Sequence, residues 1–149
     1  MEMNQKISAI LNSKGRKVWS IRPEACVYEA LEEMSDREIG ALLVISDGDL
    51  VGLLSERDYA RKVILMGRSS KDTFVSEIMT APVLTVGPDD TIDDCMRLMT
   101  GHRIRHLPVV ESGRITGVIS LGDLVNWVIR EQAETIDHLH TYIAGSYPG

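Results

Sequence analysis

The chain has 149 residues, a formal net charge of −6 and a hydrophobic content of 44%. This length suits one compact domain, and the acidic balance argues against binding to nucleic acid or to anionic membranes. No apolar run approaches the roughly 18 residues of a membrane span, and the polar first residues lack an apolar signal segment. We therefore expect a cytoplasmic protein with two reduced cysteines.

The first elements are expected to be short. Residues 7–12 predict a short helix, and the basic residues 13–17 predict a loop after it. A strand is expected at 18–21, where the following proline ends it. From Val27 onward apolar residues recur at helical spacing, and Gly40 is expected to end that helix.

A hairpin and a second helix are expected next. The apolar runs 41–45 and 50–54 flank Asp47-Gly48, which is a strong signal for a tight β-turn. Ser55 is expected to be the N-cap of the helix that follows, with Asp58 at the third position in a capping-box arrangement.

The rest of the chain repeats this order of elements. Residues 52–58 recur at 117–123, 65 positions later, in the pattern G-h-h-S-x-x-D, where h is apolar. Residues 7–12 recur at 75–80, 68 positions later, so the first copy has three additional residues in its basic loop. A repeat of this kind predicts two supersecondary units paired face to face, with a cleft at their seam.

The second copy is expected to have a strand at 83–86, a helix from Ile92, a hairpin over 107–119 and Ser120 as a helix N-cap. Apolar residues between Leu124 and Ile143 recur at helical spacing and predict an amphipathic helix. This apolar face is wider than one small copy needs, so we expect it to pack on a second subunit.

The duplicated motif resembles the CBS domain, two of which form a Bateman module. Residues 75–80 and His106-Leu107-Pro108-Val109-Val110 support the resemblance. It implies a mixed α/β (α+β) fold of two β-α-β-β-α repeats, which pair through their sheets about a pseudo-twofold axis, with a C-terminal helix. The expected boundaries are repeat 1 with its short preceding helix at 7–66, a linker at 67–74, repeat 2 with its helix at 75–130, and a helix and tail at 131–149.

The resemblance also implies a function. Such modules bind adenosine-containing ligands such as AMP, ADP, ATP, S-adenosylmethionine or NAD, often form homodimers, and regulate a partner protein. A non-catalytic sensor of adenine nucleotides is therefore expected, without a metal or a catalytic residue. Two alternatives stay open: a structural homodimerisation module with empty clefts, and a nucleotide-processing enzyme.

Two pairs of residues are the main candidates for ligand binding. Asp58 and Asp123 match the family's ribose-binding aspartate. A carboxylate suits this role, because it accepts hydrogen bonds from both ribose hydroxyls. Ser55 and Ser120 would lie at helix N-termini, where free N–H groups favour phosphate. All four residues could equally serve only as helix caps, although their repetition favours the ligand interpretation.

Further nucleotide-binding positions follow from the resemblance. Those on the first strand of each copy are Ser20, Ile21, Thr85 and Val86. Those on the strand that borders the base are Gly40, Ala41, Leu42, Arg105, His106, Leu107 and Pro108.

Basic residues suggest that the two sites are unequal. Arg57, a further candidate for nucleotide binding, precedes the aspartate in copy one, whereas Gly122 takes that place in copy two. Possible phosphate contacts are Lys14, Arg16, Lys17 and Arg103. We therefore predict that the two sites prefer different adenine nucleotides. His102 and His106 are not expected to form a metal pair, because the strand pattern around Pro108 separates them.

Overall fold

The computed structural model describes the backbone of residues 4–143 and the side chains of residues 4–133. The chain forms two compact units. The first-repeat unit is Val18–Leu84, and the second-repeat unit combines the chain up to Lys17 with the chain from Thr85 onward. Both mix helices with small sheets, as expected.

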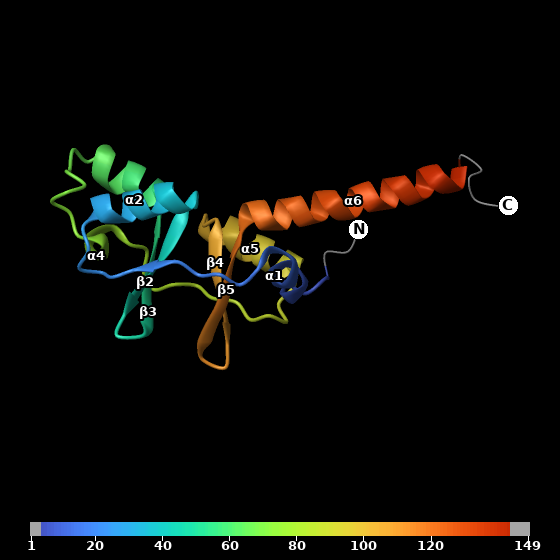
Figure 1. Cartoon of the computed structure of the whole chain (residues 1–149), viewed down its shortest axis with the longest axis horizontal. Helices are drawn as coiled ribbons and strands as arrows, with labels where there is room; N and C mark the ends of the chain where they lie inside the picture. The colour runs from blue at the N-terminus through green and yellow to red at the C-terminus, as the bar shows by residue number, and fades with distance from the viewer. Residues whose placement is uncertain (1–3, 144–149) are drawn as a thin grey trace. The chain divides into compact units, whose positions relative to one another are not determined.

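The first-repeat unit contains a three-stranded sheet of order β1-β2-β3, with β1 parallel and β3 antiparallel to the central strand. Apolar residues of α2, such as Ala30 and Met34, pack on the sheet residues Leu42, Val44 and Leu54. The elements of this unit (Figure 1) are β1 (Ser20–Ile21), α2 (Val27–Arg37), β2 (Ala41–Ser46), β3 (Asp49–Ser55), α3 (Glu56–Tyr59), the π-helix η1 (Ala60–Ile64) and α4 (Val75–Ile78).

The second-repeat unit contains the antiparallel pair β4-β5. Its elements are α1 (Ser8–Lys14), α5 (Ile92–His102), β4 (His106–Glu111), β5 (Arg114–Ser120) and α6 (Leu121–Ile143). The strand expected at 83–86 is wrong, since only Val86 pairs, as a single parallel bridge with Val109. On the C-terminal side of this bridge the N–H of Gly87 donates to the Asp90 carboxylate at 2.7 Å, so it takes no part in strand pairing.

The short helix that precedes each repeat packs on the other repeat. α1 contacts β5 and α6, and the Ile7 N–H donates to the Asp90 carbonyl at 2.9 Å. α4 contacts β3, and Thr80 and Leu53 exchange two backbone hydrogen bonds of 2.8 and 3.0 Å. The compact units therefore follow packing and not the order of the repeats in the sequence.

Helix ends differ in three places from expectation. Gly40 does not end α2, because Glu38 adopts the left-handed conformation at φ 55° and Arg103, 65 positions later, does the same at φ 54° after α5. Residues 13 and 14 continue α1, which ends at Gly15 with φ 102°. The helix after Ser55 becomes a π-helix after one turn.

Both predicted hairpin turns are confirmed. Asp47-Gly48 has φ values of 50° and 82°, and Ser112-Gly113 has 51° and 77°. Two consecutive positive φ values are the mark of a type I′ turn, whose twist suits a two-residue hairpin. The Cys26 and Cys95 thiols are both free, and burial raises the pKa of Cys95 to about 12.

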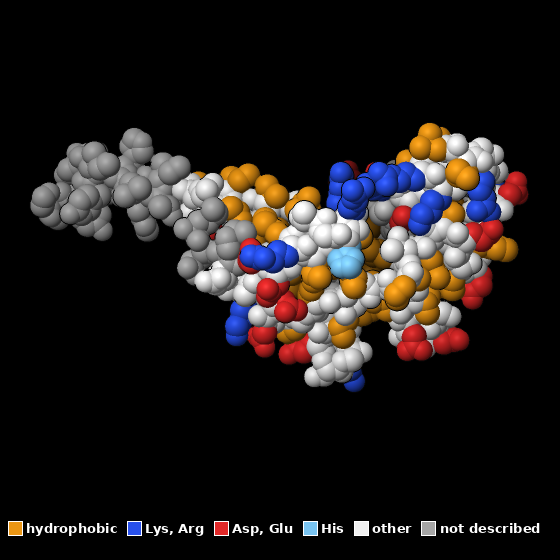
Figure 2. Space-filling view, turned by 180° about the vertical axis from the view of Figure 1, so that it is seen from behind, with side chains coloured by type: hydrophobic (Ala, Val, Ile, Leu, Met, Phe, Trp, Pro, Cys, Tyr) orange, Lys and Arg blue, Asp and Glu red, His pale blue; other side chains and the backbone are white. Residues whose placement is uncertain are grey.

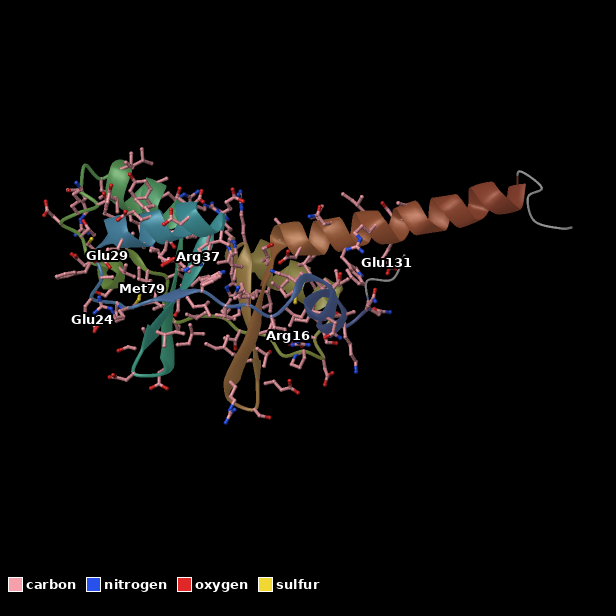
Figure 3. All side chains as sticks on the ribbon, viewed as in Figure 1. Arg16, Glu24, Glu29, Arg37, Met79 and Glu131 are labelled. Carbon is pink, nitrogen blue, oxygen red and sulfur yellow. The ribbon has the colours of Figure 1, made fainter. Side chains whose placement is uncertain are left out.

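The glycine of each G-h-h-S-x-x-D motif permits a close approach of the short helical segment that packs in the same unit. A Cβ at Gly117 would lie 2.7 Å from Leu11 Cδ2. A Cβ at Gly52 would overlap the Met79 side chain, which lies beside the first-repeat sheet (Figure 3). Leu11 and Met79 are themselves 68 positions apart, so the motif glycine has the same packing role in both units.

Gly52→Ala is therefore expected to lower the free energy of unfolding by about 1–3 kcal/mol, because the added methyl group forces the Met79 segment outward. Gly101→Ala is the matched control, since nothing lies within 4 Å of a Cβ on this helical residue. That change is expected to stabilise the protein by about 0.5–1 kcal/mol. Urea unfolding measures both effects, and equal destabilisation by the two changes would contradict the packing role.

Candidate functional site

Each unit has a corner at which its last strand turns into a helix. In the β3–α3 corner (Ser55–Asp58), the Asp58 N–H donates to Ser55 Oγ at 3.2 Å and the Ser55 N–H donates to Asp58 Oδ2 at 3.0 Å. In the β5–α6 corner (Ser120–Asp123), the equivalent distances are 3.1 and 2.8 Å. The predicted capping boxes are confirmed, and each fixes the orientation of one carboxylate.

The strand that begins each hairpin meets the corner of its own unit. Ala41 pairs with Ser55, and the Glu56 N–H donates to the Gly40 carbonyl at 3.1 Å. His106 likewise pairs with Ser120, and the Leu121 N–H donates to the Arg105 carbonyl at 2.8 Å. Within each unit, the candidate base-bordering positions therefore lie directly beside the serine of the capping box.

The remaining first-strand and apolar candidates divide by exposure. Ser20 and Ile21 of β1 pair with Leu43 and Val44 of β2. Ser20 and Thr85 are exposed. Leu42, Leu107, Val86 and Pro108 are buried. Their side chains contribute to the core, so a ligand would meet mainly their backbone.

Two residues that sequence reasoning missed hold the Asp58 carboxylate. Thr80 donates its hydroxyl to Asp58 Oδ1 at 3.3 Å, and the Lys62 ammonium lies 3.3 Å from the same oxygen. Lys62 also donates to the Ile78 carbonyl at 2.9 Å. The spacing of Asp58 and Lys62, four residues apart on one helix, was the signal that could have found this ion pair.

The Asp123 carboxylate has a different partner. The Lys14 ammonium, at the last residue of α1, lies 2.6 Å from Asp123 Oδ2 and donates to the Val118 carbonyl at 2.9 Å. Lys14 was a candidate phosphate contact, and the structure brings it directly to the candidate ribose-binding carboxylate.

His106 lies beside this ion pair. Burial lowers the pKa of the His106 imidazole, and the charges of Lys14 and Arg105 lower it further, while Asp123 opposes them. The neutral imidazole is therefore the form that the folded protein favours near pH 7.

The pH dependence of stability follows from this sign. The unfolded chain takes up a proton at His106 near pH 6.5, whereas the folded chain takes it up only at lower pH. The stabilising contribution is thus fully present above pH 6.5 and is lost as the pH falls through the folded-state pKa. His106→Gln is expected to reduce the fall in melting temperature between about pH 7.5 and 5.5. An unchanged fall would contradict a depressed pKa at this residue.

The other basic candidates are distributed over both units. Arg16, just after α1 (Figure 3), donates to the Asn12 side chain at 2.8 Å. Arg103 is the exposed residue that ends α5 in the left-handed conformation. Arg57 is half-buried, and Gly122 and Lys17 are exposed.

A groove of about 380 Å³ lies next to β1 in the first-repeat unit. Its walls are acidic, with Glu29 (Figure 3) among them, and its lining residues are Ser20, Ile21, Arg22, Glu29, Glu32, Glu33 and Asp36. The positions 65 residues later that correspond to the last four are Asp94, Arg97, Leu98 and Gly101. The surroundings of the first strand therefore differ in charge between the repeats.

Within residues 4–133, no group of three or more His, Cys, Asp or Glu side chains is placed to hold a metal ion. His102 ends α5 and His106 begins β4, so these two histidines lie on separate elements, as expected. His138 and His140 lie beyond the described side chains. None of the described helices is both long and apolar enough to cross a membrane.

Comparisons with known proteins agree on one family. The sequence model of the CBS domain matches residues 12–64 and 75–130. A curated relative, the mitochondrial CBS domain-containing protein CBSX3 of Arabidopsis thaliana, is 40% identical over 151 aligned residues, which cover 95% of this chain and 73% of the relative.

Solved structures show the same fold. A protein with CBS domains from Burkholderia ambifaria has a TM-score of 0.83 and 49% identity, with 86% of this chain and 96% of that one covered. The hexameric CBS-CP12 protein of bloom-forming cyanobacteria has a TM-score of 0.73 and 28% identity, with 81% and 69% covered.

Proposed function

Because this chain belongs to the CBS domain family, we propose that it is a regulatory module that binds an adenine nucleotide and signals to a partner protein. CBS domain proteins are generally regulatory modules that bind adenine nucleotides, so the family supports this class of ligand. AMP, ADP, ATP and NAD are the candidates for this chain. Catalysis is not part of the proposal.

The observation that carries the proposal is the repetition of one carboxylate-bearing corner. Asp58 and Asp123 each accept from a backbone N–H that fixes the carboxylate, and each keeps a lysine beside it. A helix cap alone needs the serine and the aspartate but no lysine. Beside a carboxylate intended for two ribose hydroxyls, the lysine supplies a positive charge in reach of the phosphate end of the same ligand.

The mechanism in this proposal is differential binding. A nucleotide shifts a conformational equilibrium only as far as its affinities for the two states differ. Lys62 also donates to the carbonyl of Ile78 in α4, and Lys14 is the last residue of α1. A ligand that displaces either lysine from its aspartate would therefore release a contact of that helix. Occupancy of a corner would thereby alter how the short helix packed in that unit, α4 or α1, is held.

Thermal unfolding with added nucleotide tests this function. AMP, ADP, ATP and NAD are each added at millimolar concentration, and at least one is expected to raise the melting temperature, because a ligand of the native state stabilises it. At 100 times the dissociation constant, the stabilisation should reach about 2.7 kcal/mol. Adenine-free ribose 5-phosphate is the control, and no rise with any of the four nucleotides would overturn the proposal.

A homodimerisation module is the second candidate, and α6 favours it. Val125 and Ile129, four residues apart on this helix, are 40% and 55% exposed. Figure 2 shows hydrophobic side chains along the described part of α6. The apolar positions expected further along, Ile136, Leu139 and Ile143, lie outside the described side chains. Sedimentation equilibrium of the wild type and of Ile129→Glu tests this, and a monomeric wild type would exclude it.

A further inference from the structure

The Lys14 ammonium contacts groups that lie far from Lys14 in the sequence. It belongs to the last residue of α1, more than a hundred residues before the two groups that it contacts, Asp123 Oδ2 at 2.6 Å and the Val118 carbonyl at 2.9 Å. The Lys14 and Asp123 side chains are only 37% and 22% exposed, so water screens the pair less than it screens a fully exposed pair.

The first repeat has no equivalent of this residue. The position 68 residues after Lys14 is Pro82, which carries no charge. Asp58 instead pairs with Lys62 of its own helical segment and with the Thr80 hydroxyl. In the second repeat, the position equivalent to Lys62 is Trp127, whose indole N–H donates to Gln5 at 2.8 Å.

The consequence for a ligand follows from charge balance. If a ribose takes the Asp123 carboxylate, its two hydroxyls replace the Lys14 ammonium as donors. Lys14 then keeps a neutral carbonyl, that of Val118, but loses its anionic partner. Water screens this pair only in part, so the loss of the anionic partner is unfavourable for Lys14, and a ligand phosphate supplies the missing negative charge. Arg105 adds a second positive charge, near His106 in the same corner.

We propose that Lys14 makes the β5–α6 corner select phosphorylated over unphosphorylated adenosine ligands. This inference rests on the proposed function, and it assigns the selectivity to one residue of a neighbouring helix. Adenosine must break the ion pair without replacing it, whereas AMP replaces one anion by another. In the first-repeat corner the carboxylate pairs instead with Lys62 and with the Thr80 hydroxyl.

Titrations of the full chain with AMP and with adenosine test this selection. The backbone amide signals of Ser120 and Asp123 report binding at the second repeat, and those of Ser55 and Asp58 report binding at the first. In the wild type, AMP is expected to bind the second repeat at least about tenfold more tightly than adenosine. In Lys14→Met, the AMP affinity falls about tenfold and the adenosine affinity rises or stays, so the preference disappears.

Two variants serve as controls. Lys6→Met removes the same charge from the same unit, at an exposed pair with Asp89, and should leave the preference intact. Lys14→Arg keeps the positive charge and should retain the preference. If Lys14→Met does not fold, Lys14→Gln, which keeps an N–H donor, takes its place.

The outcomes separate the two claims. An unchanged AMP preference in Lys14→Met, with binding intact, overturns the role of Lys14 and leaves the proposed function standing. Loss of the preference in Lys6→Met as well overturns it too, because the effect would then follow net charge. If neither ligand shifts any of the four amides in the wild type, the proposed function and this inference both fail.

Discussion

Replacing Leu11 by alanine is expected to lower the free energy of unfolding by about 2–5 kcal/mol and to weaken the second repeat, not the first. Leu11 is 0% exposed and its side chain lies against Gly117 of β5. The truncation leaves a cavity between α1 and the β4-β5 pair. Hydrogen exchange of the backbone amides should therefore speed up in residues 106–120, about a hundred residues away in sequence.

Ile78→Ala is the reciprocal variant. Ile78 is 1% exposed, belongs to α4 and is part of the apolar core of the first-repeat unit. Its truncation should cost a similar free energy and release the amides of residues 41–55. If each variant instead weakened the repeat that follows it in the sequence, the assignment of α1 and α4 to the two units would be wrong.

Replacing both Asp58 and Asp123 by asparagine is expected to have the largest effect on ligand binding. Each loses a charged acceptor for the ribose hydroxyls, worth about 10- to 100-fold in affinity per corner. Asparagine keeps one oxygen that can accept from the serine N–H, so loss of the cap should cost only about 1 kcal/mol per helix. Calorimetric titration with AMP and urea unfolding measure the two quantities.

Asp93→Asn and Asp89→Asn are the matched controls, because Asp93 pairs with Arg97 and Asp89 with Lys6 at exposed positions of the second-repeat unit. They should change neither quantity measurably, since exposed ion pairs contribute little. An AMP affinity that survives in the double Asp58→Asn, Asp123→Asn variant would assign the two aspartates a purely structural role as helix caps.

The turns and helix caps of the repeat were predictable from sequence. Asp47-Gly48 and Ser112-Gly113 specify their turns through residues that tolerate positive φ, and Ser55 with Asp58 specifies a cap through bonds three residues apart. These features depend on neighbours in the chain, so the sequence carries them directly. The family match over residues 12–64 and 75–130 confirms the duplication that they implied.

Features that depend on distant partners were not predictable. The pairing of Lys14 with Asp123 and of Thr80 with Asp58 requires knowing that each short helix packs against the hairpin of one unit and not the other. The end of α2 at Glu38 was missed because the following glycine was the more obvious signal, yet the backbone N–H of Glu38 already reaches the Met34 and Ser35 carbonyls. The strand expected at 83–86 is reduced to the single bridge between Val86 and Val109, a pairing with a residue of the distant hairpin.

The central claim is that each of the two corners binds an adenine nucleotide and that the two are unequal. A titration of the isotope-labelled protein with AMP, following the backbone amides of Ser55 and Asp58 against those of Ser120 and Asp123, tests it most directly. We expect both pairs of amides to shift, with different midpoints, because Lys62 and Thr80 hold one aspartate and Lys14 the other. Amides that stay unmoved at both corners up to millimolar AMP would contradict it.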